Sequence, residues 1–418
     1  MRKLKIAVIG SGISGLSASW GLSKYHDIHL FEKNDYFGGH ANTLKVKLKK
    51  EESFYVDTGF IVFNHLNYPN LCNLFNELDV KTYESDMSFA ASLNNGSLEY
   101  SGSSLGSMFA QKKNIFNFRY LRMLLEIIKF YKNVEYDKMN YKDLTIENYL
   151  KVKNYSEFFK YKHIYPMASS IWSSSLNEIK KYPFEQFVNF FSNHGLLNLI
   201  NRPKWRTVLN GSQSYVKKII EKENISAIKN VDIEINKFKN GKLTLRINKK
   251  DEQFDHVIIA VHSNQVKRVN KTPNLNNIKI FEDIKYTTNE VFLHTDETFM
   301  PNLKKVWSSW NYLEGRNDNQ LSVTYWMNKL QKLDIKTNIF VTLNPFTKPS
   351  KEKIIKRIIY DHPIYDLKTF KTQKKIRQIQ GENNIWYCGA YLGYGFHEDG
   401  IKSGLDVVNQ ILKIKINE

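Results

Sequence analysis

The sequence predicts an α/β protein in which a Rossmann-like dinucleotide-binding domain is combined with a discontinuous α+β substrate domain. Two observations lead to this fold class. A glycine-rich fingerprint follows an apolar run at the amino terminus, and a strand-to-glycine element lies near the carboxyl terminus. The chain has 418 residues, more than one ordinary domain needs. Since 42% of the residues are hydrophobic and 14% are aromatic, we expect two well-packed, interleaved domains.

The amino-terminal segment has the order of elements that a βαβ unit requires. Residues 4–9 are mostly apolar, as in a parallel strand that is covered on both faces. Residues 10–15 read GSGISG, and an amphipathic run over 16–25 predicts a helix. A second strand over 28–31 ends at Glu32. A GxGxxG run in this context predicts a dinucleotide site.

Each residue type in this fingerprint has a physical task. Gly10 permits the tight turn, Gly12 lets the backbone approach a pyrophosphate, and Gly15 lets the helix pack against the sheet. The free amides at the helix start stabilise phosphate charge. Glu32 can accept hydrogen bonds from both ribose hydroxyls, and it disfavours a 2′-phosphate. The candidate cofactor-binding residues of this segment are Gly10, Ser11, Gly12, Ile13, Ser14, Gly15, Glu32 and Lys33.

Further glycine elements follow. Gly38 and Gly39 precede His40, and a strand-to-turn element over 56–60 contains Thr58, Gly59 and Phe60. Near the end of the chain, residues 385–390 read as a strand that enters a glycine turn. The run 393–400, with five further candidates, precedes an amphipathic helix over 401–411. These carboxyl-terminal candidates are Gly389, Gly395, Phe396, His397, Asp399 and Gly400.

Together these motifs resemble the flavin amine oxidase and phytoene desaturase superfamily. More narrowly, the chain is similar to the bacterial "predicted NAD/FAD-binding protein" branch often found beside cyclopropane-fatty-acid synthases. The resemblance covers essentially the whole chain. Its markers are the 10–15 fingerprint with Glu32, the runs 38–43 and 57–60, the run 202–206 and the run 393–400.

This resemblance implies FAD, held by a Rossmann-like domain of GR2 type. The carboxyl-terminal motif would lie under the flavin, with the start of the last helix facing its N1–C2 oxygen locus and Asp399 as N-cap. Residues 228–235 alternate like a strand, and Val231 would offer its backbone amide and carbonyl to the adenine. His40 departs from the Arg of many relatives, and Ala390 departs from their acid. Cys388 does not match a tethering position, so we expect non-covalent FAD.

The resemblance also predicts how the chain is divided. The FAD-binding domain would comprise residues 1–90, 205–280 and 370–418. Residues 91–204 and 281–369 would form the substrate domain. An apolar strand over 254–262 would lead the chain back into the nucleotide domain.

The sequence contains no second GxGxxG run, which indicates that the substrate, rather than NADPH, reduces the flavin. Oxygen or a quinone-like compound would then accept the electrons. The leading hypothesis is an oxidoreductase that removes a hydride from a small or lipid-like substrate to flavin N5, with acyl-chain desaturation favoured. An amine oxidase that forms an imine is the alternative. A hypothesis of another class is a non-catalytic FAD-containing or nucleic-acid-binding protein.

Candidate residues on the substrate side are aromatic, amide and histidine side chains. The aromatic set for an apolar cavity is Trp172, Trp205, Trp307, Trp310, Trp326 and Tyr325. A further set expected to pack over the flavin is Asn289, Trp310, Asn311, Asn328 and Asn344. The histidines His194, His262, His294, His362 and His397 lack metal-ligand spacing, so we expect no metal. Among them, His397 is favoured as proton acceptor.

Charge and cysteine content bear on partners. The net charge is +19, but 51 of the 61 basic residues are Lys, a spread composition that makes nucleic acid an unexpected partner. Residues 115–131 mix apolar and basic side chains, so this helix either contacts an anionic membrane or simply packs on the core. Only Cys72 and Cys388 are present, which suits the cytoplasm. We therefore expect a cytoplasmic protein, with peripheral contact at the inner membrane face as an open alternative.

Overall fold

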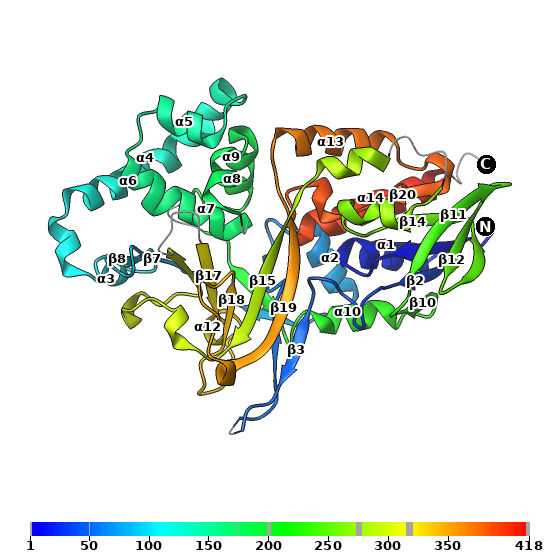
Figure 1. The fold of residues 1–418 in the computed structure, drawn as a ribbon, viewed down its shortest axis with the longest axis horizontal. Helices are drawn as coiled ribbons and strands as arrows, with labels where there is room; N and C mark the ends of the chain where they lie inside the picture. The colour runs from blue at the N-terminus through cyan, green and yellow to red at the C-terminus, as the bar shows by residue number, and fades with distance from the viewer. Residues whose placement is uncertain are drawn as a thin grey trace.

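The computed structural model describes residues 2–49, 51–172, 174–198, 202–272, 278–314 and 321–414. The nucleotide-binding sheet lies at the end of the molecule that carries both termini, and a group of helices forms the opposite end (Figure 1). A large sheet connects the two parts. Within the described residues, no helix combines the length and the apolar character that crossing a membrane requires.

A five-stranded parallel sheet forms the first part, in the order β10-β2-β1-β14-β20. Its strands are β1 (Lys5–Ile9), β2 (Asp27–Phe31), β10 (Ile225–Ile228), β14 (His256–Ile259) and β20 (Ile385–Tyr387). The apolar runs predicted as strands over 4–9, 28–31, 254–262 and 385–390 each contain one of these strands. Because the sheet draws strands from three distant segments, the nucleotide-binding part is discontinuous.

Helix α1 (Ile13–Ser23) packs against this sheet and is buried on every side. A helix is present as predicted, but it is not amphipathic. Helix α14 (His397–Ile414) covers the face of α1 that would otherwise be exposed to solvent. The two helices approach closely at two glycines. A Cβ on Gly21 would lie 2.9 Å from Val408, and a Cβ on Gly404 would lie 2.4 Å from the Ser14 carbonyl oxygen. Helices α2 (Pro69–Glu77) and α10 (Gln213–Ile220) also contact this layer.

The second large element is a seven-stranded sheet with the order β19-β15-β18-β17-β16-β7-β8. Its strands are β7 (Phe89–Leu93), β8 (Leu98–Ser101), β15 (Tyr286–His294), β16 (Trp310–Glu314), β17 (Leu321–Trp326), β18 (Phe340–Leu343) and β19 (Ile354–Pro363). The long antiparallel pair β15 and β19 runs from this sheet toward the nucleotide-binding part (Figure 1).

Smaller sheets complete the fold. They are formed by β3 (Thr43–Val46) with β4 (Phe54–Asp57), by β5 (Val62–Asn64), β9 (Trp205–Val208) and β6 (Thr82–Glu84), and by β11 (Ile233–Lys239), β12 (Lys242–Ile247) and β13 (Lys250–Phe254). The strand predicted over 228–235 is wrong. Strand β10 ends at Ile228, and β11 begins only at Ile233. Between them, Asn230 has a positive φ of 58°, which interrupts the extended backbone.

The helical part surrounds an aromatic core. Its members are α3 (Leu105–Met108), the 3-10 helix η1 (Lys112–Phe116), α4 (Phe118–Tyr141), α5 (Ile146–Val152), α6 (Glu157–Phe159), the π-helical turn η2 (Lys160–Ile164), α7 (Tyr165–Trp172), α8 (Leu176–Lys180) and α9 (Phe184–Asn193). The helix predicted over 115–131 is confirmed as α4, which begins after Asn117 because that side chain caps it. The remaining α-helices are α11 (Val266–Val269), α12 (Met327–Leu330) and α13 (Leu367–Gln378).

The domain boundaries predicted from the sequence stay a prediction. The segments assigned to the FAD-binding domain contribute all strands of the five-stranded sheet. The segments assigned to the substrate domain contribute the helical part and the seven-stranded sheet, except that β7 begins at Phe89. The last four residues of the range 370–418 lie outside the described residues.

Candidate functional site

A cavity of about 660 Å³ begins at the carboxyl ends of β1 and β2 and extends to the seven-stranded sheet. Ligands of open α/β sheets bind at this edge of the strands. The volume falls within the range of cofactor and ligand sites. One end of the cavity is lined by loops of the five-stranded sheet, and the other by β7, β16, β17, β18, α7 and α9.

Most of the residues predicted to bind the cofactor line this one cavity. They are Gly10, Ser11, Gly12, Ile13, Ser14, Glu32, Lys33, Gly39, His40, Thr58, Gly59, Phe60, Val231, Gly389, Gly395, Phe396 and His397. They come from both ends of the sequence and from its middle. Four other predicted residues, Gly15, Gly38, Asp399 and Gly400, are not among the lining residues.

Three of these four are glycines with packing tasks. A Cβ on Gly15 would lie 1.9 Å from the carbonyl oxygen of Gly10. A Cβ on Gly400 would lie 2.6 Å from the Ile13 side chain, and one on Gly38 would lie 2.4 Å from the carbonyl oxygen of Ala41. These glycines therefore shape the turn and the helix contacts behind the cavity wall.

Gly12 differs from these glycines because a Cβ there would meet nothing within 4 Å. Its backbone is extended, with φ −63° and ψ 173°, and it is the N-cap of α1 without a side-chain cap. The open space lies directly at the helix start, where free amides and the helix dipole favour a phosphate. Gly39 is next to it, since a Cβ on Gly39 would lie 3.2 Å from the Gly12 Cα. This geometry fits a pyrophosphate.

Glu32 is buried at the end of β2, where its carboxylate is held rigidly. The Ser11 backbone amide and hydroxyl group donate to Oε2 at 2.9 and 2.6 Å, and the Asn34 amide donates to Oε1 at 2.9 Å. A carboxylate has about four lone-pair sites, so it retains capacity for further donors. The residue can therefore accept hydrogen bonds from ribose hydroxyl groups at the cavity wall.

Val231 lines the cavity, but its predicted use of the backbone amide is wrong. The amide donates to the carbonyl oxygen of Glu32 at 3.1 Å. The chain between β10 and β11 crosses the end of β2 here, and it uses that amide to continue the backbone hydrogen bonding. Only the side chain and the carbonyl group of Val231 remain for a ligand.

Asp399 is not the N-cap of the last helix. Helix α14 begins at His397, four residues before the predicted start, so Asp399 occupies the third helical position. Its carboxylate reaches back and accepts a hydrogen bond from the Phe396 amide at 2.9 Å, as the N3 acid of a capping box does. Burial raises the pKa of Asp399 to about 6. The positive end of α14 still faces the cavity through His397.

Three histidines gather beside the two glycine turns. The ring of His40 lies 5.2 Å from that of His362 and 6.1 Å from that of His262, and it stacks on Tyr360 at 4.6 Å. Burial lowers the pKa of His362 to about 4, and burial with the neighbouring imidazoles lowers the pKa of His40 well below its ordinary value. Within the described residues, no group of His, Cys, Asp or Glu is arranged to hold a metal ion.

A chain of amides fixes the tautomer of His362. The Glu290 amide donates to Oδ1 of Asn344 at 3.0 Å, so the Asn344 amino group must donate to Oδ1 of Asn289, at 2.7 Å. The Asn289 amino group in turn lies 2.9 Å from Nδ1 of His362. Nδ1 therefore accepts this bond, and the neutral ring carries its proton on Nε2.

His397, the predicted proton acceptor, is held between two aromatic residues. Its ring stacks on Phe60 at 3.7 Å, and its Nε2 lies 2.5 Å from the Tyr215 hydroxyl group. Burial lowers the pKa of His397 to about 3. This geometry favours a positioning role, and proton acceptance by His397 stays a prediction.

The other predicted histidines divide into two groups. His194, His262 and His362 line the cavity. His294 is completely buried away from it and contacts the Thr342 hydroxyl group at 2.7 Å. The tautomer of His194 is also defined, because its Nδ1 lies 2.9 Å from the Phe190 carbonyl oxygen. A carbonyl oxygen only accepts, so Nδ1 carries the proton and Nε2 has the lone pair.

Four of the six aromatic candidates line the cavity, namely Trp172, Trp205, Trp310 and Tyr325. Trp307 and Trp326 do not, since they pack against each other edge to face at 5.5 Å behind the sheet. The amides Asn311 and Asn328 bond backbone carbonyl groups instead of facing the cavity. Spacing along the sequence could not separate the two faces of the sheet.

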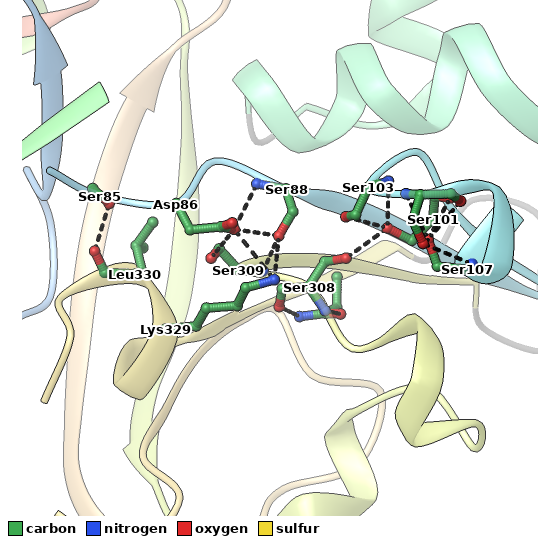
Figure 2. Close-up of polar contacts among 12 residues, drawn as sticks. Ser85, Asp86, Ser88, Ser101, Ser103, Ser107, Ser308, Ser309, Lys329 and Leu330 are labelled. Carbon is green, nitrogen blue, oxygen red and sulfur yellow. Dashed lines mark hydrogen bonds and ion pairs between the residues drawn. The ribbon is translucent and has the colours of Figure 1, made fainter. Parts of the chain in front are cut away.

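Polar contacts join Ser309, the residue before Trp310, to Asp86, Ser88 and their neighbours (Figure 2). Ser309 donates its hydroxyl group to Asp86 at 2.7 Å and its amide to Ser88 Oγ at 3.0 Å. Lys329 Nζ donates to the same Ser88 Oγ at 3.1 Å. The Trp310 amide also donates to the Ser88 carbonyl oxygen at 2.9 Å. The backbone that carries Trp310 is therefore held by the segment around Asp86 and Ser88, which is far from it in the sequence.

Several lining residues were missed by sequence reasoning. They include Tyr36, Ala260, Val261, Arg268, Tyr286, Tyr360, Asp361 and Tyr365. Ala260 carried a usable signal, because it follows an apolar strand that we expected in the nucleotide domain. The lining residues from β15 and β19 carried no signal in the sequence, because only the pairing of these strands brings them to the cavity.

Comparison with known protein families gives two matches. A family described as NAD(P)-binding Rossmann-like domain matches residues 8–78, and one described as flavin containing amine oxidoreductase matches residues 204–363. The chain belongs to the flavin amine oxidase superfamily. It is an FAD-dependent oxidoreductase, and its family membership favours an enzyme over the non-catalytic hypothesis. The association with cyclopropane-fatty-acid synthases is not shown.

Several solved structures are similar to this chain in fold. A CLA-producing fatty acid isomerase from P. acnes has 15% identity, covers 97% of this chain and 98% of its own, and gives a TM-score of 0.68. Putrescine oxidase bound to putrescine has 13% identity, 99% coverage of both chains and a TM-score of 0.68. Cyclohexylamine oxidase from Brevibacterium oxydans IH-35A has 10% identity, 100% coverage of both chains and a TM-score of 0.67. A search of curated proteins finds no match.

The residues of this FAD-dependent oxidoreductase fit its cofactor. Gly12 leaves room at the start of α1, Glu32 offers a fixed carboxylate, and the start of α14 reaches the same cavity. Cys388 is buried, its thiol pKa is raised by burial, and it is not among the lining residues. That placement agrees with the expected non-covalent binding, which stays a prediction.

Proposed function

We propose that this flavin amine oxidase homologue oxidises an apolar, acyl-chain-like substrate and leaves a carbon–carbon double bond. When bound, FAD would supply a two-electron acceptor. The chain itself has three tasks: to hold the cofactor, to position a C–H bond against it in a site free of water, and to accept one proton.

One observation carries the proposal, namely the apolar character of the distal cavity wall. The lining residues there are Met87, Phe89, Met167, Ile171, Trp172, Phe190, Leu196, Trp205, Trp310, Tyr325, Leu330 and Leu343. The charged lining residues among those described lie elsewhere. Glu32, Lys33 and Asp232 belong to loops of the nucleotide-binding part, and Arg268 belongs to its helix α11. Asp361 on β19 accepts a hydrogen bond from the Thr288 hydroxyl group at 2.7 Å.

Such a wall favours a hydrocarbon chain over a charged ligand. Each buried CH₂ group contributes about 0.8 kcal/mol, whereas an ammonium group without a carboxylate partner is costly to desolvate. An amine could still bind in neutral form, and aromatic faces attract cations. The similarity to putrescine oxidase and cyclohexylamine oxidase keeps the amine-to-imine reaction as the second candidate.

His194 is the better-placed proton acceptor in this proposal. Its Nδ1 proton is held by the Phe190 carbonyl group, so Nε2 is the free acceptor atom. Phe190 also lines the cavity, and its ring stacks on the His194 ring at 3.9 Å. Burial lowers the pKa of His194 to about 4, which keeps the ring neutral and able to accept a proton at physiological pH.

The decisive experiment is anaerobic reduction of the purified flavoprotein. A panel of free fatty acids, acyl phospholipids, monoamines and diamines is mixed with the enzyme, and bleaching of the flavin absorbance is followed. We expect acyl substrates to bleach the flavin and amines to leave it oxidised, with a C=C product identified by mass spectrometry. Bleaching by amines alone would establish the second candidate instead.

The electron acceptor is tested on the reduced enzyme. Oxygen and a water-soluble quinone are added separately, and reoxidation of the flavin is timed. Without a second dinucleotide fingerprint in the sequence, we expect one of these two to be effective and NAD(P)⁺ to be ineffective. A product with a shifted double bond and no net oxidation would indicate isomerisation.

A further inference from the structure

One face at the helical end of the molecule exposes large apolar side chains. We call this set the η1–α4 face, and its members are Leu105, Ile115, Phe116, Phe118, Leu121, Leu125 and Ile128. The exposed fractions reach 90% for Phe116 and 78% for Phe118. Scattered apolar residues on a surface need no explanation, but a contiguous group marks a contact site.

Helix α4 carries two apolar stripes instead of one. The stripe toward the core consists of Tyr120, Met123, Ile127, Phe130 and Val134. The exposed stripe consists of Phe118, Leu121, Leu125 and Ile128, with Tyr136 and Met139 further along. Both follow the three-and-four-residue spacing of one helix face, and at 100° per residue they lie on nearly opposite sides. The outer stripe is therefore left without a protein partner among the residues that the structure describes.

Basic side chains surround the exposed stripe. Residues 112–132 contain six of them, Lys112, Lys113, Arg119, Arg122, Lys129 and Lys132, all exposed. The single acid in this range, Glu126, is buried and is shared by Arg122 and Ser156. Apart from Arg122, which pairs with Glu126, these basic residues leave a net positive charge beside protruding aromatic and aliphatic side chains.

We propose that the η1–α4 face docks the enzyme on an anionic lipid bilayer. Phe116 and Phe118 would insert among the acyl chains, and the basic residues would contact the phosphate groups. Amphipathic helices with basic flanks bind membrane interfaces in this way. The proposal does not depend on which substrate the cavity accepts.

Charge argues against a second copy of the chain as the occupant. A symmetric dimer would place the same face against itself, and so would bring basic residues against basic residues. The cores of protein interfaces are also depleted in charged residues, whereas Lys132 lies within the exposed stripe. An anionic surface matches both features.

The position of the face is also consistent with docking. It lies on the helices at the end of the molecule remote from both termini (Figure 1). Helix α4 packs on α9, which supplies Phe190 to the cavity wall. A docked enzyme would hold its substrate half, and not its nucleotide half, against the bilayer.

Vesicle flotation with the FAD-loaded protein tests the proposal. One set of vesicles contains phosphatidylcholine only, and in the other about a third of the lipid is phosphatidylglycerol. We expect at least about tenfold more protein on the anionic vesicles, with release at high salt. Phe116→Ser with Phe118→Ser, and separately Lys112→Glu with Lys113→Glu, should each reduce binding about tenfold or more.

Matched controls are available on the β3 hairpin and on α13. Lys47→Glu with Lys49→Glu makes the same change in net charge at a site away from the η1–α4 face. Leu367→Ser removes an exposed apolar side chain that is also remote from that face. Both should bind like the wild type. A Phe118→Trp variant should show a blue-shifted emission only with anionic vesicles.

Three outcomes would overturn the proposal. The first is equal binding of the wild type and both face variants. The second is a dimer, detected by light scattering without lipid, that Phe116→Ser with Phe118→Ser converts to a monomer. The third is binding to DNA that the Lys pair abolishes and the Phe pair leaves intact. Circular dichroism and FAD content verify that each variant is folded.

Discussion

The Tyr215 hydroxyl group lies 2.5 Å from Nε2 of His397, at the base of the cavity. Burial raises the pKa of Tyr215 well above its ordinary value and lowers that of His397 to about 3. Both groups are therefore neutral, and the hydroxyl group donates its proton to Nε2. The atom of His397 that could accept a proton from a substrate is already engaged.

This relationship predicts different effects for two histidines. We expect His194→Gln to slow anaerobic flavin reduction about 100-fold or more, the usual contribution of a general base. His397→Gln should change that rate much less and instead lower the melting temperature, because it breaks the contact with Tyr215. Stopped-flow reduction and thermal unfolding measure the two effects. Full loss of reduction in a stable, FAD-loaded His397→Gln protein would restore His397 as the proton acceptor.

A second prediction separates two glycines of the same fingerprint. The backbone of Gly12 suits any L-residue, and its Cβ would meet open space. Gly12→Val should therefore fold normally as apo-protein but bind FAD at least about 100-fold more weakly, a loss of ~3 kcal/mol. FAD titration by fluorescence quenching and apo-protein melting provide the two readouts.

Gly15→Ala is the matched control. Its Cβ would lie 1.9 Å from the Gly10 carbonyl oxygen, so the apo-protein itself should be destabilised by about 3 kcal/mol or more. Should Gly12→Val bind FAD like the wild type, the start of α1 would not be the phosphate site.

A third prediction concerns the buried pair Asp57 and Gln331, which joins β4 to the turn after α12. The Asp57 amide donates to Oε1 of Gln331, and Nε2 of Gln331 donates to Oδ2 of Asp57, each at 2.9 Å. The first bond fixes the orientation of the Gln331 side-chain amide. Asp57→Asn would therefore place its new side-chain amino group against the amino group of Gln331. We expect a loss of about 2 kcal/mol in unfolding free energy.

Adding Gln331→Glu to Asp57→Asn should recover most of that loss. The new carboxylate can accept from both the backbone amide and the new amino group, whereas Gln331→Glu alone would oppose two carboxylates. Urea unfolding of the four proteins measures the coupling as a double-mutant cycle. Additive losses would show that the pair is not coupled as described.

A fourth prediction is acid lability of the apo-protein. Burial lowers the pKa of several histidines, including His163 and His397 to about 3 and His194, His294 and His362 to about 4. A depressed pKa in the folded state means that stability is present above pH 6.5 and is lost as the pH falls toward these values. Each such group contributes a slope of about 1.4 kcal/mol per pH unit.

Asp57 and Asp399 act in the opposite direction, since burial raises each pKa to about 6. Their contribution is present below pH 4 and is lost as the pH rises through 6. Because the histidines outnumber them, unfolding free energy measured in urea should decrease between pH 6.5 and 4. His163→Phe should reduce the slope of unfolding free energy against pH by about 1.4 kcal/mol per pH unit, which corresponds to one proton. An unfolding free energy that increases as the pH falls from 6.5 to 4 would contradict these pKa assignments.

The sequence by itself determined the nucleotide-binding half of the molecule. Apolar strands, glycines at fixed spacing and an acid at the end of the second strand are local signals, because each task is performed within a few residues of the backbone. Most residues predicted from them line the cavity. The sequence could not indicate that Gly12 faces open space while Gly15 packs against Gly10, since both are glycines of one motif.

Only the tertiary structure decided the other half. Strands β15 and β19 bring His362 and Tyr360 beside His40, and pairing over such distances leaves no periodic trace in the sequence. The Phe396 amide donates a hydrogen bond to the Asp399 carboxylate at the start of α14. The N-cap therefore lies three residues before Asp399, the residue predicted for that position. The tautomers of His194 and His362 follow from carbonyl and amide groups supplied by packing. Protonation and reactivity thus depend on neighbours that folding alone assembles.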